Sequence, residues 1–223
     1  KMSNYFRRLP DFEYVSRLPD AKISDYVRVK NLFKKAIIRE DIFQDLSFFT
    51  KFQIVGDDRP DNVAFNVYGD STLDWLVLQC NNIINVQTEW PLRQGDFDRY
   101  CLEKYGDYDT LYNGVHHYET VEIKNSRGTT IVEAGKQVPS DFSVQFFDDK
   151  LEQIITANNI TTEITNYTYE DNIQTDKRSI YLLKDIYIPV VLEDLEDMME
   201  YREGSTQFVS ETLKRADNIR LYE

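Results

Sequence analysis

The stretch Phe52–Leu92, FQIVGDDRPDNVAFNVYGDSTLDWLVLQCNNIINVQTEWPL, holds the densest local signals for regular structure in the chain. Its start overlaps residues 48–55, an apolar run typical of a strand. Pro60 suits the first turn of a helix, where its missing N–H costs nothing, and Gly69 suits the position directly after a helix end. A second helix is indicated by apolar residues at i, i+3, i+4 and i+7: Leu73, Leu76, Val77 and Cys80. Residues 88–92 predict a short returning strand, so the stretch predicts a strand–helix–helix–strand module.

A module of about forty residues is small for an independent core, so we expect support from the rest of the chain or from neighbouring subunits. Hydrophobic residues make up 41% and aromatic residues 13% of the chain, which favours a folded core over wholesale disorder. The aromatic residues are weighted toward Tyr, with 15 Tyr against 13 Phe and 2 Trp. Tyrosine is enriched at protein interfaces and also suits half-buried strands, and the sequence leaves both interpretations open.

Before and after the module the patterns are shorter. Residues 1–20 contain two prolines and scattered aromatic residues, which predicts an extended arm. Tyr26–Asn31 alternates apolar and polar residues like a strand. Val115–Lys124 and Thr129–Glu133 also alternate, and they flank a turn in which Gly128 suits a positive φ. These two segments therefore predict a β-hairpin.

The last third of the chain is read from apolar spacing alone. Leu151 with Ile154 and Ile155 predicts a short helix, whereas residues 161–169 look strand-like. Ile180–Leu183 predicts a strand, and Pro189 lies near the start of a helix. The final segment predicts an amphipathic helix, because four apolar residues fall on one side of it: Phe208, Val209, Leu213 and Ala216.

These signals divide the chain into four regions. Residues 1–45 form an N-terminal arm with short elements, and residues 46–93 form the module. Residues 94–172 hold a helix, the β-hairpin and an irregular part, and residues 173–223 hold a strand and C-terminal helices. The predicted fold class is α+β, with a small β-α-α-β module and a hairpin-containing, helix-terminated C-terminal region.

The string R-P-D-x-V-A-x-x-V-Y-G-D-x-x-L-x-W-L-V-L-x-C-N, which begins at Arg59, resembles the signature of a family of wedge proteins from T-even-type phage baseplates, the product of gene fifty-three. The same residues resemble a degenerate LysM module, whose pattern is a strand, a G-D turn, a helix, Y-G, a second helix and Asn. The resemblance spans residues 48–92 and returns at Lys177–Met199. The positions that it assigns to the architecture of the module are Arg59, Pro60, Ala64, Tyr68, Gly69, Leu73, Trp75 and Asn81.

The resemblance implies a structural subunit of the contractile-tail baseplate. Such a protein binds other wedge proteins and helps to join neighbouring wedges around the central hub, as part of a hetero-oligomeric assembly. It is made in the cytoplasm of the host bacterium and resides in the tail baseplate of the virion. The resemblance implies neither enzymatic activity nor a cofactor or small-molecule substrate. The two resemblances agree if the wedge protein uses a LysM-like fold for assembly.

The charge balance argues against two classes of partner. The formal net charge is −13, from 26 basic and 39 acidic residues, and no basic stripe offsets it. Such a chain repels nucleic acid backbones and anionic membrane surfaces. The sequence shows no secretion signal and no long apolar run, so we expect no membrane span. Its two cysteines, Cys80 and Cys101, are too few for a disulfide framework.

The alternative interpretation is a LysM-type protein that binds peptidoglycan or another glycan. In LysM modules the sugar lies against the first and last helix–strand connections, here residues 56–59 and 82–86. Asp58 and Asn82 are then the candidate contacts. The single module, the missing export signal and the length of the remaining chain count against this alternative.

No catalytic or metal-binding residue is predicted. His116 and His117 are neighbours on a predicted strand, so we expect them on opposite faces and unable to share an ion. Asp57, Asp58 and Asp61 suit a turn and a helix cap, because the spacing of a calcium-binding loop is absent. A carboxylate pair assembled by the fold is a third, weaker option. The sequence therefore favours a protein that is not an enzyme.

Overall fold

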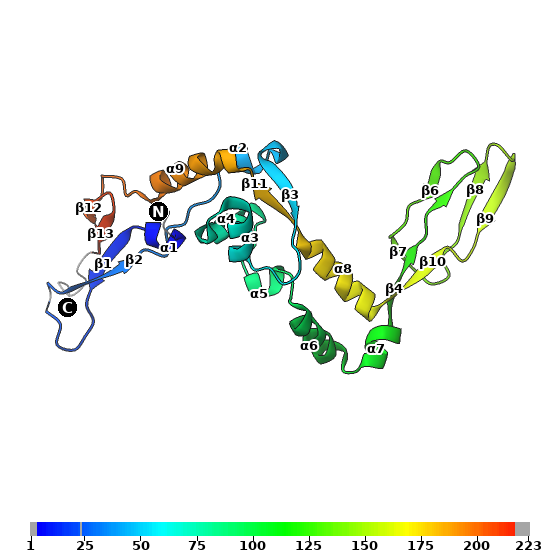
Figure 1. Cartoon of the computed structure of the whole chain (residues 1–223), viewed down its shortest axis with the longest axis horizontal. Coiled ribbons are helices and arrows are strands. Elements are labelled where there is room, and N and C mark those ends of the chain that lie inside the picture. Colours follow the sequence, from blue (N-terminus) through cyan, green and yellow to red (C-terminus); the bar gives the residue numbers. More distant parts are fainter. Residues whose placement is uncertain (1–3, 23, 217–223) are drawn as a thin grey trace. The chain divides into compact units, whose positions relative to one another are not determined.

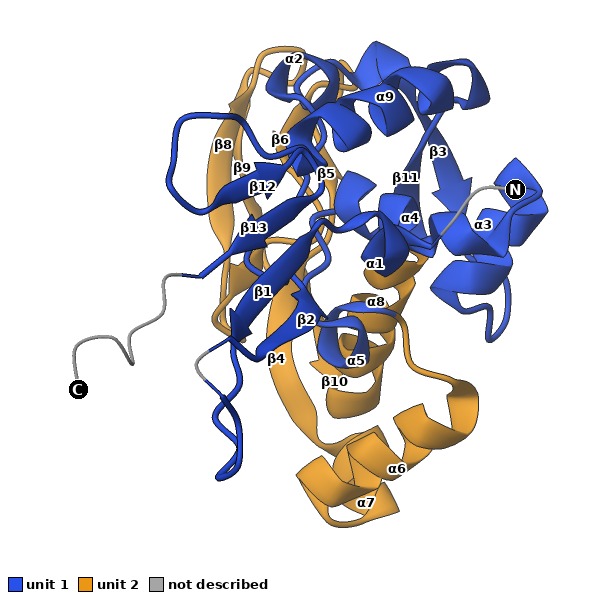
Figure 2. Cartoon of the chain, turned by 90° about the vertical axis from the view of Figure 1, so that its left-hand side faces the viewer, with its two compact units in different colours: residues 1–90, 179–223 blue, residues 91–178 orange. Residues whose placement is uncertain are grey.

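The computed structural model describes residues 4–22 and 24–216 (Figure 1). The chain divides into two compact units, which Figure 2 draws in two colours. Unit 1 comprises Lys1–Trp90 and Ser179–Glu223, and unit 2 comprises Pro91–Arg178. Both units mix short helices with small sheets, so the α+β class is confirmed. In the described ranges, no helix combines the length and apolarity that a bilayer-crossing segment needs.

Unit 1 contains the predicted module and both ends of the chain. Its helices are α1 (Tyr5–Arg8), α2 (Glu40–Phe43), α3 (Pro60–Tyr68), α4 (Asp74–Cys80), α5 (Val86–Glu89) and α9 (Ile188–Met199). Short 3-10 turns occur at Leu46–Phe48, Ser71–Leu73 and Asp185–Tyr187. Its strands are β1 (Asp11–Val15), β2 (Tyr26–Lys30), β3 (Phe49–Gln53), β11 (Ser179–Leu183), β12 (Phe208–Ser210) and β13 (Leu213–Arg215).

The two predicted helices of the module are confirmed. Pro60 is the first residue of α3, and Gly69 ends that helix in the left-handed conformation with φ 72°. The Asp70 side chain accepts a hydrogen bond from Thr72 N–H, which starts the turn leading into α4. The apolar face predicted for the second helix is buried. Periodicity and turn residues were therefore sufficient signals for these two helices.

The predicted returning strand at residues 88–92 is wrong, because Val86–Glu89 forms α5. The Asn85 side chain accepts from Gln87 N–H, and the Glu89 carboxylate accepts from the N–H groups of Ile84 and Asn85, so local bonds close a helical turn. The partner of β3 is β11, which pairs with it antiparallel in the register Ser179↔Gln53 to Leu183↔Phe49. Strand, two helices and strand are present, but unit 2 is inserted before the second strand.

The main core of unit 1 surrounds this βααβ arrangement. Val63, Ala64, Leu76 and Val77 from α3 and α4 are fully buried, and Ile180, Leu182 and Leu183 of β11 pack with them. Helix α9 adds the side chains of Val191, Leu195 and Met199. The small module therefore receives the support that its length demands from a segment more than a hundred residues away.

The N-terminal arm and the C-terminal helix expected from sequence are both wrong in the described range. Residues 11–15 form β1, which pairs antiparallel with β2 and parallel with β13, in the sheet order β12-β13-β1-β2. The segment predicted as an amphipathic helix contains β12 and β13 instead, and residues 217–223 of that prediction lie outside the described residues. Short apolar spacing fits either structure, and pairing with β1 decides it.

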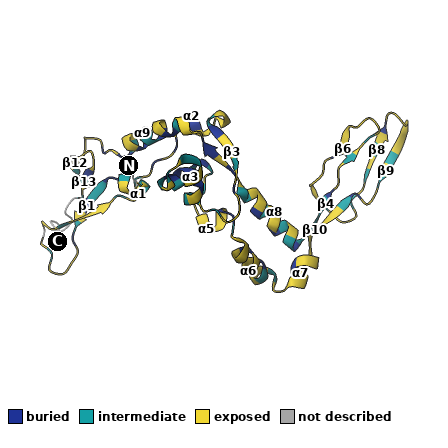
Figure 3. Ribbon diagram, in the orientation of Figure 1, coloured by how far each residue is buried: buried dark blue, intermediate teal, exposed yellow. Residues whose placement is uncertain are grey.

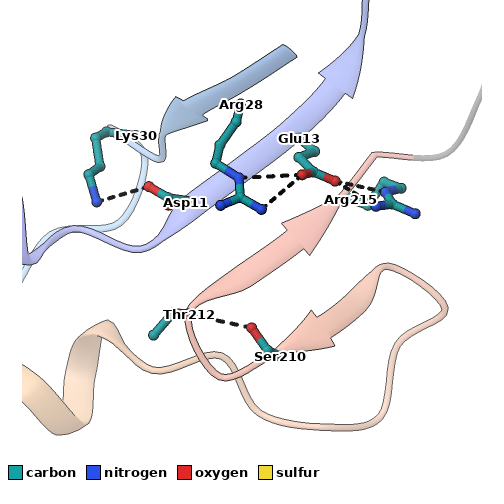
Figure 4. A network of polar contacts seen from close by, with 7 residues as sticks. All are labelled: Asp11, Glu13, Arg28, Lys30, Ser210, Thr212 and Arg215. Carbon is teal, nitrogen blue, oxygen red and sulfur yellow. Dashed lines mark hydrogen bonds and ion pairs between the residues drawn. The ribbon is translucent and has the colours of Figure 1, made fainter. Parts of the chain in front are cut away.

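Glu13 on β1 joins the two ends of the chain, as Figure 4 shows. Its carboxylate accepts from Arg28 Nη2 at 3.2 Å and from Arg215 Nε at 2.8 Å. The Arg215 hydrogen bond is the main reason that the pKa of Glu13 lies below its usual value, and Arg28 adds to it, while burial opposes both. Lys30 and Asp11 form a further ion pair at 2.8 Å on the same sheet.

Unit 2 consists of three helices and three small sheets. Its helices are α6 (Gln94–Tyr105), α7 (Tyr108–Asn113) and α8 (Asn166–Arg178). Its strands are β4 (Val115–Thr120), β5 (Ile123–Lys124), β6 (Thr130–Val132), β7 (Gln137–Val138), β8 (Val144–Asp148), β9 (Gln153–Ala157) and β10 (Thr161–Thr165). The sheets are β10-β4-β7, β5-β6 and β8-β9. Its described apolar core is small, with Phe97, Cys101 and Leu111 buried together.

Two sequence expectations for unit 2 have different outcomes. The predicted hairpin turn is confirmed, because β5 and β6 pair antiparallel around Gly128, whose φ is 82°. The short helix predicted from Leu151, Ile154 and Ile155 is wrong, because residues 153–157 form β9 and pair along their whole length with β8. Two isoleucines followed by threonine favour a strand, and the spacing of three apolar residues did not outweigh that preference.

Candidate functional site

The outer edge of β11 is closed by side chains of the sequence motif. At the end of the β3–β11 ladder, Lys184 N–H bonds to the Phe48 carbonyl oxygen at 3.0 Å. Only every second residue of an antiparallel strand bonds to its partner strand, so the backbone N–H and C=O of Tyr181 point away from β3. Tyr181 N–H donates to Asn81 Oδ1 at 2.7 Å, and Asn81 Nδ2 donates to the Tyr181 carbonyl oxygen at 2.8 Å. Asn81 therefore takes the place of a neighbouring strand.

A second side chain of the motif closes the same edge at Leu183. The Tyr68 hydroxyl donates to the Leu183 carbonyl oxygen at 3.0 Å, and burial raises the pKa of that phenol. The buried Cys80 thiol lies beside the same residue, and its pKa is raised to about 12 because burial disfavours the thiolate, against a smaller opposing effect of the Leu183 N–H. At neutral pH Cys80 is a neutral thiol, so its place in the edge is structural rather than nucleophilic.

The remaining motif positions lie in or beside the same core. Arg59 forms an ion pair with Asp61 at 3.2 Å at the start of α3. Ala64 and Leu73 are buried, and Trp75 is 9% exposed with its ring centroid 5.5 Å from that of Tyr5. The structure therefore places the motif around the β11 edge and the helix packing of the module. Among the described residues, it gathers no set of charged or nucleophilic groups there.

The two glycan candidates lie at different places in unit 1. The Asp58 carbonyl oxygen accepts from Trp90 Nε1 at 2.9 Å. Asn82 has φ 53° and lines a groove of about 450 Å³, together with Tyr5, Ile37 and Ile84. Asp58 does not line this groove. The structure therefore does not bring Asp58 and Asn82 into one described hollow.

Unit 1 exposes many large apolar side chains. Some line the 450 Å³ groove, where Ile37 and Ile84 are largely exposed and Phe43 is nearly half exposed. Others lie in loops or in the short 3-10 turns, and the most exposed of these are Leu18, Leu32, Phe33, Leu46, Val55 and Ile186. Scattered exposed apolar residues are ordinary, but groups of them at one groove are typical of a surface that another molecule covers.

The β8–β9 hairpin of unit 2 exposes apolar side chains as well. Phe147 and Ile154 are a direct cross-strand pair, and they are 57% and 71% exposed. Leu151 in the turn is half exposed, and Figure 3 shows that few residues of the unit 2 strands are buried. A two-stranded hairpin of this kind is marginally stable in water without a covering surface. The hairpin thus presents an uncovered apolar face.

Asp148 anchors this hairpin from inside. Its side chain, in a residue only 1% exposed, accepts from the N–H groups of Ser126 at 2.8 Å, Lys150 at 3.0 Å and Leu151 at 3.2 Å. The bonds from Ser126, followed by those from Leu151 and Lys150, lower the pKa of Asp148 to about 2 against the opposing effect of burial. Asp148 thus fixes the turn of the β8–β9 hairpin and joins it to the turn between β5 and β6.

Residues 6–137, more than half of the chain, match the family described as base plate wedge protein 53. The chain belongs to this family. It is accordingly a structural, non-enzymatic protein of the phage baseplate, and its location is the tail baseplate of the virion. No curated protein matches the chain. The matched range includes the whole sequence motif from Arg59 to Asn81 and reaches into unit 2.

The histidines of this wedge family member lie closer together than the sequence suggested. The Nδ1 atoms of His116 and His117 are 2.9 Å apart, and the His116 ring stacks on Tyr169. The expectation of opposite faces is wrong because the pairing of β4 with β10 shifts register at this point, which leaves His116 as an extra residue. His117 Nε2 contacts Glu119, and no group of three or more metal-ligating side chains occurs among the described residues.

A buried polar stripe on α8 was not predicted from the sequence. Asn166, Glu170 and Gln174 recur at i, i+4 and i+8, and all three are buried. Glu170, 2% exposed, accepts from Lys104 Nζ and Tyr105 Oη, and Gln174 accepts from Leu92 N–H. The Glu170 hydrogen bond is the main cause of the raised pKa of Lys104. Periodicity of polar residues was the available signal, but such a stripe usually indicates a solvated face.

Proposed function

We propose that this wedge protein binds other wedge proteins and helps to join neighbouring wedges into the ring around the hub. In this proposal its βααβ module is a LysM-like fold that serves as an assembly joint rather than a sugar-binding site. The protein is then a structural link whose exposed apolar surfaces are covered on assembly. The observation that carries the proposal is the uncovered apolar face of the β8–β9 hairpin in a baseplate family member.

The order of elements supports the LysM-like part of the proposal. Strand β3, helices α3 and α4, and strand β11 follow one another as β-α-α-β, with β3 and β11 antiparallel. The Asn that ends the LysM pattern corresponds to Asn81, which here binds the backbone of β11. The polar groups of that Asn are thus occupied within the module, which favours a structural role for it.

The energetics of assembly follow from the exposed side chains. Covering the Phe147 and Ile154 pair removes apolar area from water, and each side chain contributes about 1.5–3 kcal/mol when it is fully buried. Aromatic and large apolar residues in such a patch are typical anchors of protein interfaces. Because the chain carries a net charge of −13, partners with basic or mixed surfaces fit it best.

Co-sedimentation with the other wedge proteins of the same phage tests this function. We expect the wild-type chain to move with the assembled wedge on a density gradient. The double variant Phe147→Ser, Ile154→Thr is expected to lower incorporation by about tenfold or more, because a covered pair of this size is worth more than 1.4 kcal/mol. Its melting temperature stays near that of the wild type, since both side chains are exposed in the free chain.

The matched control lies on the same face of the same hairpin. Gln145 and Thr156 form the next cross-strand pair on that side, so Gln145→Ser with Thr156→Ser changes polar residues at equal strand positions. Normal incorporation of this control is expected. A wild-type chain that stays free of the wedge contradicts the proposed function. If the Phe147→Ser, Ile154→Thr variant incorporates normally, the β8–β9 hairpin is not part of the assembly surface.

A further inference from the structure

The outer edge of β3 is left open by the same unit that closes the outer edge of β11. The ladder alternation that turns Tyr181 outward also turns the N–H and C=O groups of Lys51 and Gln53 away from β11. Throughout residues 4–22 and 24–216, none of these four groups has a hydrogen-bond partner, and both side chains are exposed. At the start of the strand, Phe49 N–H is already taken by the Leu46 carbonyl oxygen.

The open edge is held in a fixed position by the core. Phe49 of β3 is buried, and the strand pairs over its full length with β11, whose Ile180 and Leu182 belong to the main apolar cluster. The backbone N–H and C=O groups of Lys51 and Gln53 are therefore already arranged as in a β-strand before a partner binds. Such a preordered edge is a template for an added strand.

We propose that an extended segment of another baseplate wedge protein adds to the outer edge of β3 as a third strand. The proposal rests on the proposed function and names one contact within it. Main-chain hydrogen bonds to Lys51 and Gln53 supply the attachment, and side chains on alternate faces of the added strand supply specificity. The sheet then becomes three-stranded, with its β11 edge still closed by Asn81.

The chemistry of the edge defines the segment that fits. Lys51 is exposed and forms no ion pair with any described residue, so an acidic side chain directly opposite it is favoured. On the other face, Thr50 and Phe52 border a groove of about 270 Å³ that Val67 and Leu182 also line. The residues before and after the acidic one are therefore apolar.

A second copy of this chain fits the edge less well. Antiparallel pairing of β3 with itself over its full length places Lys51 opposite Lys51, and like charges directly opposite each other destabilise a strand pair. The acidic and apolar segment of a different protein avoids that repulsion. This difference in charge is why the proposal names another wedge protein as the occupant.

Proline at position 51 tests the backbone contact, because Lys51 N–H lies outside the β3–β11 ladder. Lys51→Pro removes the outward donor and leaves the ladder bonds of Thr50 and Phe52, as is tolerated on edge strands. The matched control is Lys51→Thr, which loses the charge but keeps the N–H and favours a strand. We expect Lys51→Pro to lower incorporation into the wedge by about tenfold, and Lys51→Thr by a smaller factor. Incorporation of Lys51→Glu is expected to be lower than that of Lys51→Thr, since the glutamate repels the acidic residue of the partner.

Hydrogen exchange of the wild-type chain gives a second measurement that does not depend on the folding of a variant. The Lys51 and Gln53 amides are expected to exchange rapidly in the free chain and at least about tenfold more slowly in the assembled wedge. Equal exchange in both states overturns the proposal, as does a folded Lys51→Pro variant that incorporates normally. Dimers of the free chain that Lys51→Pro abolishes assign the edge to a second copy instead. If the wild-type chain fails to enter the wedge, the proposed function fails, and the two failures are distinguishable.

Discussion

Asn81 shows how one polar side chain substitutes for a strand. Its amide group has one acceptor and two donor hydrogens, and the two groups of Tyr181 that it binds are separated along β11 as they would be for a neighbouring strand. The third contact, from Nδ2 to the Val77 carbonyl oxygen at 2.8 Å, holds the amide at the end of α4. A helix end and a strand edge are thus satisfied by the same residue.

The Asn81→Ala variant is expected to lose about 1–2 kcal/mol of unfolding free energy, because it removes three hydrogen bonds at a partly exposed site. In a chain of this size, each kcal/mol lowers the melting temperature by about 2–4 °C. Thermal unfolding followed by circular dichroism measures the change. Asn82→Gly is the matched control, since that neighbour is exposed and its φ of 53° suits glycine. Equal losses for both variants contradict the role given to Asn81.

For single residues, the sequence indicated which side chains contribute to the architecture of the module but not which groups they contact. Tyr68 and Asn81 stand out because the family resemblance assigns both to the architecture of the module. Their partners, Leu183 and Tyr181, lie 115 and 100 residues further along the chain. A hydrogen bond between residues so far apart depends on the tertiary fold and leaves no local pattern. The contact of Glu170 with Lys104 could not be predicted for the same reason.

At the scale of elements, the β8–β9 hairpin depends on one buried carboxylate. Asp148 accepts three backbone N–H groups, two in its own turn and one from the turn between β5 and β6. These bonds favour the ionised form, which is why the pKa of Asp148 falls to about 2. An ionised Asp148 therefore stabilises the folded hairpin more than the unfolded chain.

The sign of the pH dependence follows from that lowered pKa. The ordinary value for the carboxyl is 3.8 and the folded value is about 2, so the stabilisation is present above about pH 4 and is lost as the pH falls toward 2. Protection factors of the Ser126, Lys150 and Leu151 amides are expected to decrease over that range. Asp148→Asn is expected to lower these protection factors at neutral pH and to flatten their change between pH 4 and pH 2. The neighbouring substitution Asp149→Asn is the control, and an unchanged wild-type slope in the Asp148→Asn variant contradicts this account.

Helices that end in a glycine were predictable, whereas several elements that exist only through distant pairing were not. Helices α3 and α6 both have a glycine directly after the last turn. Helix α3 lies where Pro60 and Gly69 predicted it, and α6 is the helix expected within residues 94–172. Strands β1, β12 and β13 are short, and their apolar spacing also fits a helix or an arm. Their form is decided by the parallel pairing of β1 with β13, residues near opposite ends of the sequence.

At the scale of the whole molecule, both units are closed by residues distant in sequence. Unit 1 takes its second module strand from β11, after the inserted segment 91–178. Its four-stranded sheet joins the first and last described strands through Glu13. Unit 2 has a small described apolar core and a polar seam along α8. A family match could identify the baseplate wedge, but only the fold shows which surfaces the chain leaves uncovered.

The central claim is that the module is an assembly joint of a baseplate wedge protein and not a glycan site. One partition experiment tests it most directly: the purified chain is offered insoluble peptidoglycan and the remaining wedge proteins of the same phage, and its amount in each fraction is measured. We expect the chain in the wedge fraction, with Asp58→Ala and Asn82→Ala leaving the distribution unchanged. Retention on peptidoglycan that either substitution releases, together with absence from the wedge fraction, would contradict the account.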